Sequence, residues 1–232
     1  MRHFLCMARI LAIGSGGFFE AKDVAMQRYI LRCADVPRPR VCFLATGKGD
    51  NPQHHAWFDQ AFGALPCETS HLQLFDRTQT DLEGFVLEHD IVLVWGGNTA
   101  SLLAVWRAHG LDRVLRKALQ AQVVLAGFCA GALAWFEMGI TDSFGGIAPL
   151  SDGLGLLPGS VCPHYDGDPR RRPMYLDAVA SGTMAPGYAL EADAGLRFED
   201  GALTEAFGSR EGARAWRVEP GGATSLPTTL LG

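Results

Sequence analysis

Short apolar runs alternate with amphipathic segments over the first part of the chain, and this alternation constrains the fold more than any other feature. The apolar runs cover residues 8–13, 41–46, 71–75, 91–97 and 123–128, and helical patterns lie at about 20–34, 52–64, 81–88, 99–120 and 130–138. Uniformly apolar runs are typical of strands buried on both faces, and strand–helix alternation is typical of parallel sheets. The sequence therefore predicts a three-layer α/β fold, in which a mostly parallel sheet carries helices on both faces.

Four of the predicted strands end in loops of small or polar residues, which gives the first indication of a site. The loops are residues 14–17, 46–49, 96–99 and 127–131. Right-handed crossovers place the carboxyl ends of parallel strands along one edge of the sheet. The four loops should therefore converge on one rim.

After about residue 145 the pattern changes to loops rich in Gly and Pro, one helical stretch and short strands. The helix is expected near 171–181 and the strands near 188–190, 194–206 and 213–218. A chain of 232 residues suits a single α/β domain, so we expect one domain over residues 1–232, β-rich from about residue 185. The last dozen residues are rich in Gly, Pro and Thr and predict a short loose tail.

Charge and cysteine usage exclude several classes of protein. With 20 basic and 25 acidic residues the net charge is -5, and no basic cluster suits nucleic acid or anionic lipid. The uncharged stretch 118–136 contains two Gln and two Gly residues, which favours a buried strand, turn and helix over a membrane span. Six scattered cysteines without a CxxC pair, and glycines too early for a signal peptide, indicate a cytoplasmic protein.

The segment Gly127-Phe128-Cys129-Ala130-Gly131 follows the apolar run 123–128 and precedes a helical pattern. A G-x-C-x-G sequence in this context is typical of a nucleophile elbow, in which two glycines allow a sharp turn that exposes the central side chain. Backbone N–H groups just after the turn can stabilise a thiolate or an oxyanion. The alternative is a buried structural cysteine in a glycine-rich turn.

A second loop, Gly96-Gly97-Asn98-Thr99, follows the apolar run that begins at residue 91. Its glycine pair would let the Gly97 N–H approach a substrate carbonyl, while Asn98 or Thr99 would cap the following helix equally well. The third signal is His164 in Cys162-Pro163-His164-Tyr165-Asp166, since the other histidines lie at the terminus or in ordinary strand and helix patterns. Histidine is the usual general base, although a lone histidine is often structural.

Taken in order, the elbow, the GGNT loop and the PHY segment resemble the peptidase E family of serine peptidases. The resemblance covers nearly the whole chain, through ILAIGSGGF, RVCFLATGKGD, VWGGNTASLL, GFCAGALAWFEMGITDSFGG and LGLLPGSVCPHYDGDPRRR. It implies a flavodoxin-like fold, similar to that of class I glutamine amidotransferases, and a nucleophile–His–acid triad. The roles fall on Cys129, His164 and Asp142, with Gly97 and Ala130 supplying the oxyanion hole.

The orienting acid has two further candidates. Glu137 lies in a predicted helix that leads away from the elbow, whereas Asp166 stands two residues after His164, as in the triads of glutamine amidotransferases. This sequence also departs from the family at the nucleophile, where Cys129 replaces serine. A thiol can perform the same hydrolysis through a thioester, but a pocket built around oxygen need not place sulfur well.

The resemblance implies a small peptide substrate with an amino-terminal aspartate, cleaved after that residue. Its carboxylate would need polar partners, for which the candidates are Asn98, Thr99, Arg170, Arg171 and Arg172. No His, Cys or Asp spacing is typical of a metal site, and we expect neither metal nor cofactor, and a monomer or a homodimer. The alternatives are a Cys–His amidase or amidotransferase-like enzyme resting on Asp166, and a catalytically silent thiol sensor.

Overall fold

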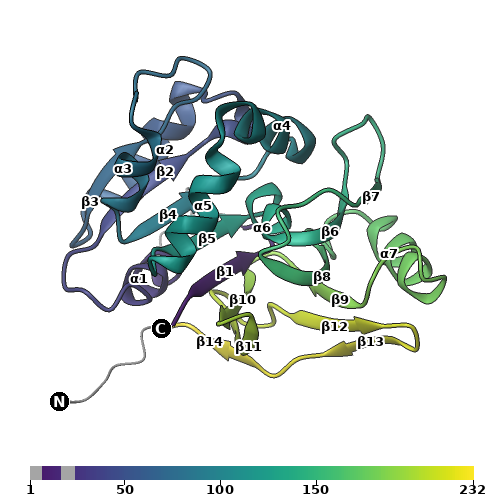
Figure 1. Cartoon of the computed structure of the whole chain (residues 1–232). Helices are drawn as coiled ribbons and strands as arrows, with labels where there is room; N and C mark the ends of the chain where they lie inside the picture. Colours follow the sequence, from purple (N-terminus) through teal and green to yellow (C-terminus); the bar gives the residue numbers. More distant parts are fainter. Residues whose placement is uncertain (1–6, 17–23) are drawn as a thin grey trace.

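The computed structural model describes residues 7–16 and 24–232 and contains two β-sheets (Figure 1). The larger sheet has the order β14-β11-β10-β1-β5-β4-β2-β3. Its strands are β1 (Arg9–Ile13), β2 (Arg40–Leu44), β3 (Glu68–His71), β4 (Ile91–Val94), β5 (Val124–Phe128), β10 (Ala194–Glu199), β11 (Ala202–Gly208) and β14 (Thr228–Leu230). Strands β3, β2, β4, β5 and β1 are parallel, and β10 is antiparallel to both of its neighbours.

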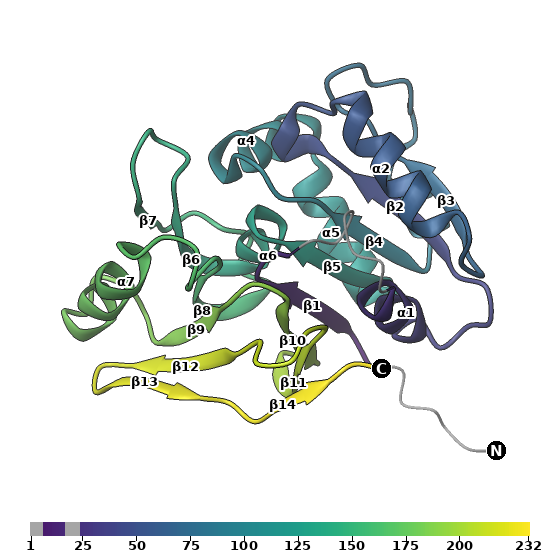
Figure 2. The same cartoon turned by 180° about the vertical axis from the view of Figure 1, so that it is seen from behind.

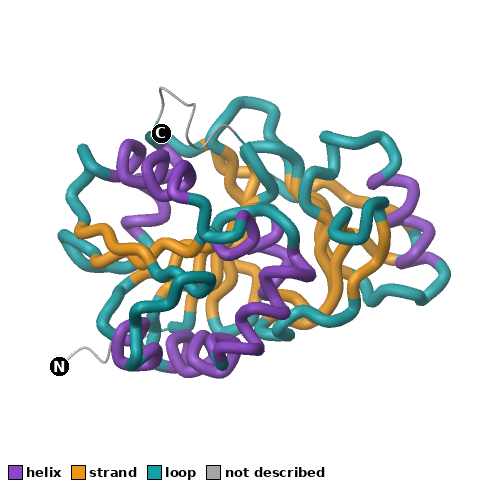
Figure 3. The backbone as a smooth tube through the Cα atoms, turned by 90° about the horizontal axis from the view of Figure 1, so that it is seen from above, coloured by secondary structure: helices purple, strands orange, loops and turns teal. Residues whose placement is uncertain are grey.

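Helices cover both faces of this sheet, which confirms the predicted fold class. The helices are α1 (Ala25–Arg32), α2 (Pro52–Phe62), α3 (Leu82–Leu87), α4 (Thr99–His109), α5 (Leu111–Gln120), α6 (Ala130–Trp135) and α7 (Arg171–Ala180), with a 3₁₀ turn η1 (Thr46–Lys48). Figure 1 shows α3, α4 and α5 on one face, and Figure 2 shows α1 and α2 on the other. Seen from above, strands lie between the helices (Figure 3).

The parallel strands β1, β2, β4 and β5 are buried on both faces because their side chains alternate between two cores, whereas the edge strand β3 is partly exposed. In β4, Val92 and Val94 pack in one cluster with α3, α4 and α5, whereas Ile91 and Leu93 pack in the other with α1 and α2. Successive side chains of a strand point to opposite faces, so a strand of this kind must be apolar throughout. This is the physical reason why the apolar runs predicted the sheet.

The second sheet was absent from the sequence-based expectation. It has the order β13-β12-β9-β8-β6-β7, with strands β6 (Phe136–Thr141), β7 (Ala148–Leu150), β8 (Leu157–Cys162), β9 (Gly187–Leu190), β12 (Ala215–Glu219) and β13 (Gly222–Ser225). The helix expected over 130–138 ends at Trp135, and the chain becomes extended at Phe136. There Phe136 pairs with Leu157 of β8, so a pairing distant in sequence overrides the local helical pattern.

Four smaller expectations also need correction. Strand β3 covers Glu68–His71 rather than 71–75, and the helix expected over 99–120 is two helices separated by Gly110, whose φ is +73°. The expected loose tail forms β13 and β14, and Leu231 is buried in the core. The helix expected over about 20–34 begins at Ala25, and residues 20–23 of that prediction lie outside the described residues.

One hydrophobic cluster draws residues from both sheets, including Val92 of β4, Phe136 of β6 and Val161 of β8. The second sheet is thus joined to the first around α6, directly behind the turn that follows β5. Within residues 7–16 and 24–232, we find no helix with both the length and the apolar character that a membrane span requires.

Candidate active site

The turn between β5 and α6 has the strained geometry of a nucleophile elbow. Cys129 has φ 53° and ψ -106°, an unusual conformation for a residue with a side chain, and its N–H donates to Ile13 O at 2.9 Å. A Cβ on Gly127 would overlap the Gly131 carbonyl carbon, and a Cβ on Gly131 would lie 2.7 Å from Val94 O. Both glycines are therefore required for α6 to pack this close to the strands.

His164 lies in the loop after β8 and faces the cysteine. Its Nε2 is 2.7 Å from Cys129 Sγ, and its own backbone also has a positive φ, 55°. The loop is held by two backbone hydrogen bonds, from Tyr165 N to Leu190 O at 2.9 Å and from Gly167 N to His164 O at 3.1 Å. The second sheet therefore brings His164 to a cysteine that follows β5 of the first sheet.

Burial acts in opposite directions on the pKa values of Cys129 and His164. It raises the pKa of the Cys129 thiol, and hydrogen bonds from the Gly97 and Ala130 backbone N–H groups oppose this rise. Burial lowers the pKa of His164, and the nearby Arg171 charge lowers it further. Each shift favours the uncharged form of its own group.

The Gly96-Gly97 loop lies directly against Cys129. A Cβ on Gly96 would be 3.0 Å from Cys129 Cβ, and a Cβ on Gly97, whose φ is +136°, would overlap Gly47 O. The loop is fixed in this position by Asn98 N, which donates to Gly47 O at 2.8 Å. The N–H groups of Gly97 and Ala130 consequently both face the sulfur.

Arg171 is a buried structural cation behind the site. Its side chain is 6% exposed and donates to Ile140 O at 3.2 Å, to Pro163 O at 3.4 Å and to Asp142 Oδ2 at 3.1 Å. It therefore joins β6 to the loop that carries His164.

The three candidate acids occupy different environments. Asp142 is paired with Arg171, and Asp166 accepts from Ala192 N at 2.9 Å. Glu137 lies in β6 rather than in a helix, and accepts from Gly159 N at 2.8 Å. Among hydrogen bonds between described residues, none joins His164 to any of these carboxylates. Charges on Asp142 and Asp166 nevertheless raise the pKa of His164, against the larger effects of burial and Arg171.

A cavity of about 220 Å³ opens in front of the sulfur. It is lined by Ser15, Gly16, Lys48, Trp95, Gly96, Gly97, Phe128, Cys129 and His164, so all four predicted loops contribute to it. The rings of Trp95 and Phe128, 5.2 Å apart between centroids, form an apolar wall. Among these lining residues Lys48 is the single lysine, arginine or carboxylate. Sequence reasoning placed its loop on the rim but did not select Lys48 as a site residue.

The predicted polar substrate contacts lie outside the lining of this cavity. Asn98 caps α4, since its Oδ1 accepts from Ser101 N at 2.8 Å and its Nδ2 donates to Ser143 O at 3.1 Å. Thr99 is buried at the start of the same helix.

The arginines beside Arg171 also have partners. Arg170 forms an exposed ion pair with Asp168 at 2.8 Å, and the Arg172 guanidinium lies over the rings of Tyr165 and Trp216, 5.4 Å and 5.2 Å from their centroids. In the part of the chain that the structure describes, no group of three or more His, Cys, Asp or Glu side chains is placed to hold a metal ion.

Comparison with known proteins decides the family. Residues 10–206 match the family model of peptidase family S51. The chain belongs to peptidase family S51. It is 44% identical over 213 residues to the uncharacterized peptidase YgaJ of Bacillus subtilis (strain 168), covering 91% of this chain and 92% of that protein. The family assignment confirms the resemblance to peptidase E and makes the chain a peptidase.

Solved structures confirm the S51-type fold. A peptidase from an acI-B1 actinobacterium superposes with a TM-score of 0.76 at 16% identity, over 96% of both chains. A putative peptidase E from Listeria monocytogenes EGD-e gives a TM-score of 0.64 at 18% identity, over 85% of this chain and 97% of that one. At these identities the likeness concerns the fold alone.

Proposed function

We propose that this S51 peptidase hydrolyses small peptides with Cys129 as nucleophile and His164 as base. The observation that carries the proposal is the 2.7 Å separation of His164 Nε2 and Cys129 Sγ at a strained elbow. The backbone N–H groups of Gly97 and Ala130, which face the sulfur, form the oxyanion hole.

The reaction begins from the neutral pair. As Sγ attacks the carbonyl carbon, Nε2 accepts the thiol proton, the C–S bond forms and the carbonyl π electrons move to oxygen. The Gly97 and Ala130 N–H groups hold this oxyanion. Its collapse breaks the C–N bond, and the imidazolium returns the proton to the leaving amine. Water, deprotonated by His164, then hydrolyses the thioester.

We propose Asp142 as the acid that supports His164, with Asp166 as the alternative. The charge of Asp142 acts on both Cys129 and His164, whereas that of Asp166 acts on His164 and its carboxylate already accepts from Ala192 N. Asp142→Asn should reduce kcat/KM more than Asp166→Asn, because removal of the carboxylate that supports His164 lowers the rate more than removal of one that takes no part. The reverse order would assign the role to Asp166.

We further propose that the substrates are dipeptides or other small peptides with an amino-terminal aspartate, hydrolysed in the cytoplasm. The cavity of about 220 Å³ has room for a small substrate, and a lysine on its wall suits an acidic one. The family resemblance points to the same class of substrate. No metal or cofactor takes part in this proposal.

The test is hydrolysis of Asp-Leu and Leu-Leu by the natural sequence and by Cys129→Ala, Cys129→Ser and His164→Ala. We expect cleavage of Asp-Leu alone, and a loss of at least about 10³-fold in the Ala variants, because members of a catalytic unit act together. Undiminished hydrolysis by either Ala variant would contradict the mechanism. If Cys129→Ser cleaves Asp-Leu and the unsubstituted protein does not, the fold supports hydrolysis but the Cys129 thiol does not act as the nucleophile.

A further inference from the structure

We propose that Lys48 binds a carboxylate of the peptide substrate and thereby sets specificity; this inference rests on the peptidase function proposed above. Lys48 lines the cavity that contains Cys129 and His164. A lysine ammonium is a compact point charge with three donors, which binds a carboxylate without demanding one fixed geometry.

The backbone of Lys48 is held firmly in place. Lys48 N donates to Ala45 O at 2.8 Å, and Gly49, in the left-handed conformation with φ +67°, donates its N–H to Thr46 O at 3.0 Å. The Thr46 hydroxyl in turn accepts from Trp106 Nε1 at 3.2 Å. The side chain of Lys48 therefore projects from a rigid turn beside the Gly97 loop.

The ammonium group is available to a ligand. Lys48 forms no ion pair with any residue of the described ranges 7–16 and 24–232, and its side chain is exposed. The nearby carboxylate of Asp50 is turned to Leu74 N and Phe75 N, from which its Oδ2 accepts at 2.5 Å and 3.0 Å. Burial and, secondarily, the Lys48 charge lower the pKa of His54, which favours the neutral form of this neighbour.

The three arginines near His164 contrast with Lys48. Arg171 is buried against Asp142 and two carbonyl oxygens, Arg170 is paired with Asp168, and Arg172 lies over two aromatic rings. None of the three lines the cavity around the sulfur. An uncompensated cation in a cleft attracts anions and raises their local concentration. The charge that selects an acidic peptide is therefore assigned to Lys48.

A peptide substrate carries two carboxylates that Lys48 could bind. One is the side chain of the residue that supplies the scissile carbonyl, and the other is the α-carboxylate of the leaving residue. Asp-Leu carries both, Asn-Leu only the α-carboxylate, Asp-leucinamide only the side-chain carboxylate, and Asn-leucinamide neither. These four peptides separate the two sources.

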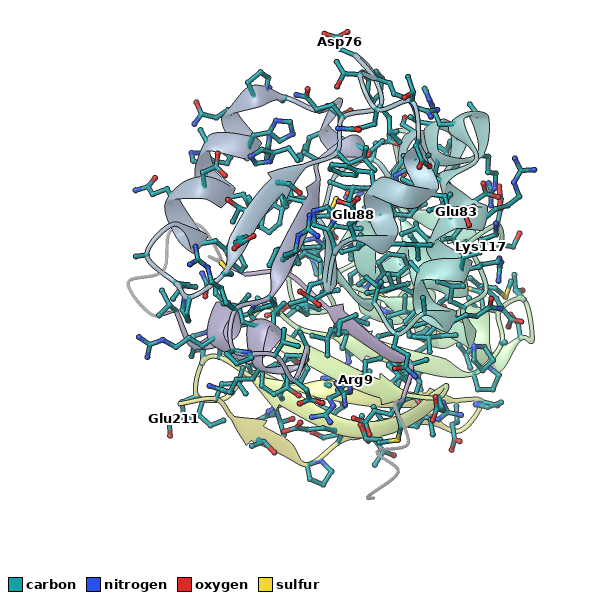
Figure 4. All side chains as sticks on the ribbon, turned by 60° about the vertical axis from the view of Figure 1, so that its left-hand side comes forward. Arg9, Asp76, Glu83, Glu88, Lys117 and Glu211 are labelled. Atoms are coloured by element: carbon teal, nitrogen blue, oxygen red, sulfur yellow. The ribbon has the colours of Figure 1, made fainter. Side chains whose placement is uncertain are left out.

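The variants are Lys48→Met, which removes the charge, and Lys48→Arg, which keeps it. Lys117→Met is the matched control, because Lys117 is exposed on α5, pairs with Glu83 at 2.7 Å (Figure 4) and is not among the residues that line the cavity. We expect Lys48→Met to lower kcat/KM for Asp-Leu about 10- to 100-fold, since a hydrogen bond to a charged group is lost. Lys48→Arg should retain most of the activity, and Lys117→Met all of it.

The peptide series identifies the bound group. If Lys48→Met lowers kcat/KM for Asp-leucinamide but not for Asn-Leu, Lys48 binds the side-chain carboxylate. The opposite pattern shows that Lys48 binds the α-carboxylate. Asn-leucinamide should be cleaved equally by the natural sequence and by Lys48→Met. An equal loss on all four peptides, or no loss on any, would overturn the proposal.

A second readout does not depend on peptide hydrolysis. Iodoacetate and iodoacetamide both alkylate a thiolate with loss of iodide, but only iodoacetate carries a carboxylate. Peptide mass spectrometry measures the alkylation of Cys129 by each reagent. We expect the ratio of the iodoacetate rate to the iodoacetamide rate to fall at least about fivefold in Lys48→Met and to stay unchanged in Lys48→Arg. If no peptide is cleaved but this ratio falls, the proposed function fails and the carboxylate site stands. An unchanged ratio in an enzyme inactive on every peptide would overturn the site as well.

Discussion

Replacement of Arg171 by Met should destabilise the protein far more than the same replacement of its neighbour Arg170. In Arg171→Met, Ile140 O and Pro163 O lose their charged donor, and a buried group left without a hydrogen bond costs about 1–3 kcal/mol. The Asp142 side chain is 66% exposed, so water replaces most of that contact. We expect the free energy of unfolding to fall by about 3 kcal/mol, which lowers Tm by about 6–12 °C at this chain length.

Thermal unfolding followed by circular dichroism measures the difference between the two variants. Arg170→Met removes the same charge from the same segment, but its pair with Asp168 lies at the surface, where ion pairs contribute little. Its Tm should therefore stay close to that of the natural sequence. Equal unfolding temperatures for the two variants would show that the buried guanidinium does not join β6 to the His164 loop in the way we describe.

Two further predictions concern the elbow and the response to pH. Gly127→Ala should reduce the alkylation rate of Cys129 at least about 100-fold, because the new methyl group overlaps Gly131 and displaces the sulfur; Gly146→Ala, at an open position, is the control and should react normally. Burial lowers the pKa of His55 and His89 below 6.5, so the unfolded chain binds more protons and stability should fall as pH drops below about 6.5. Urea midpoints between pH 7.5 and 5.5 check this, and a slope unchanged in the His55→Gln, His89→Gln variant would refute the assignment.

The parallel sheet could be predicted from sequence because its signal is local. A strand such as Ile91–Val94 is buried on both faces, and each of its residues therefore had to be apolar. The second sheet gave only part of this signal, since the strands expected near 188–190 and 213–218 correspond to β9 and β12, whereas β6, β7 and β8 were not predicted. Strand β6 begins immediately after α6, and its place depends on pairing with Leu157–Cys162 and Ala148–Leu150. Pairings of this kind depend on residues that a local window does not contain.

The elbow and the histidine could be selected from sequence for different reasons. Gly127 and Gly131 carry a local steric requirement, because each approaches backbone atoms that a side chain would displace. His164 was selected by its unusual context, and the structure places its Nε2 against Cys129 Sγ through the second sheet, which the sequence analysis had not anticipated. The family resemblance thus carried information on long-range placement that residue patterns alone did not.

The sequence did not reveal which charged residue near the site is free to bind a ligand. Three consecutive arginines beside His164 suggested an anion-binding group, yet each is engaged by its own neighbours in the fold. Lys48 is 116 residues away from His164 in the sequence and reaches the same cavity because β2 and β4 are adjacent and parallel. Whether a cation is available to a ligand depends on the partners that the fold supplies, and these are set by tertiary structure. Removal of the Lys48 charge should therefore alter the choice of substrate, whereas removal of the Arg171 charge should first alter stability.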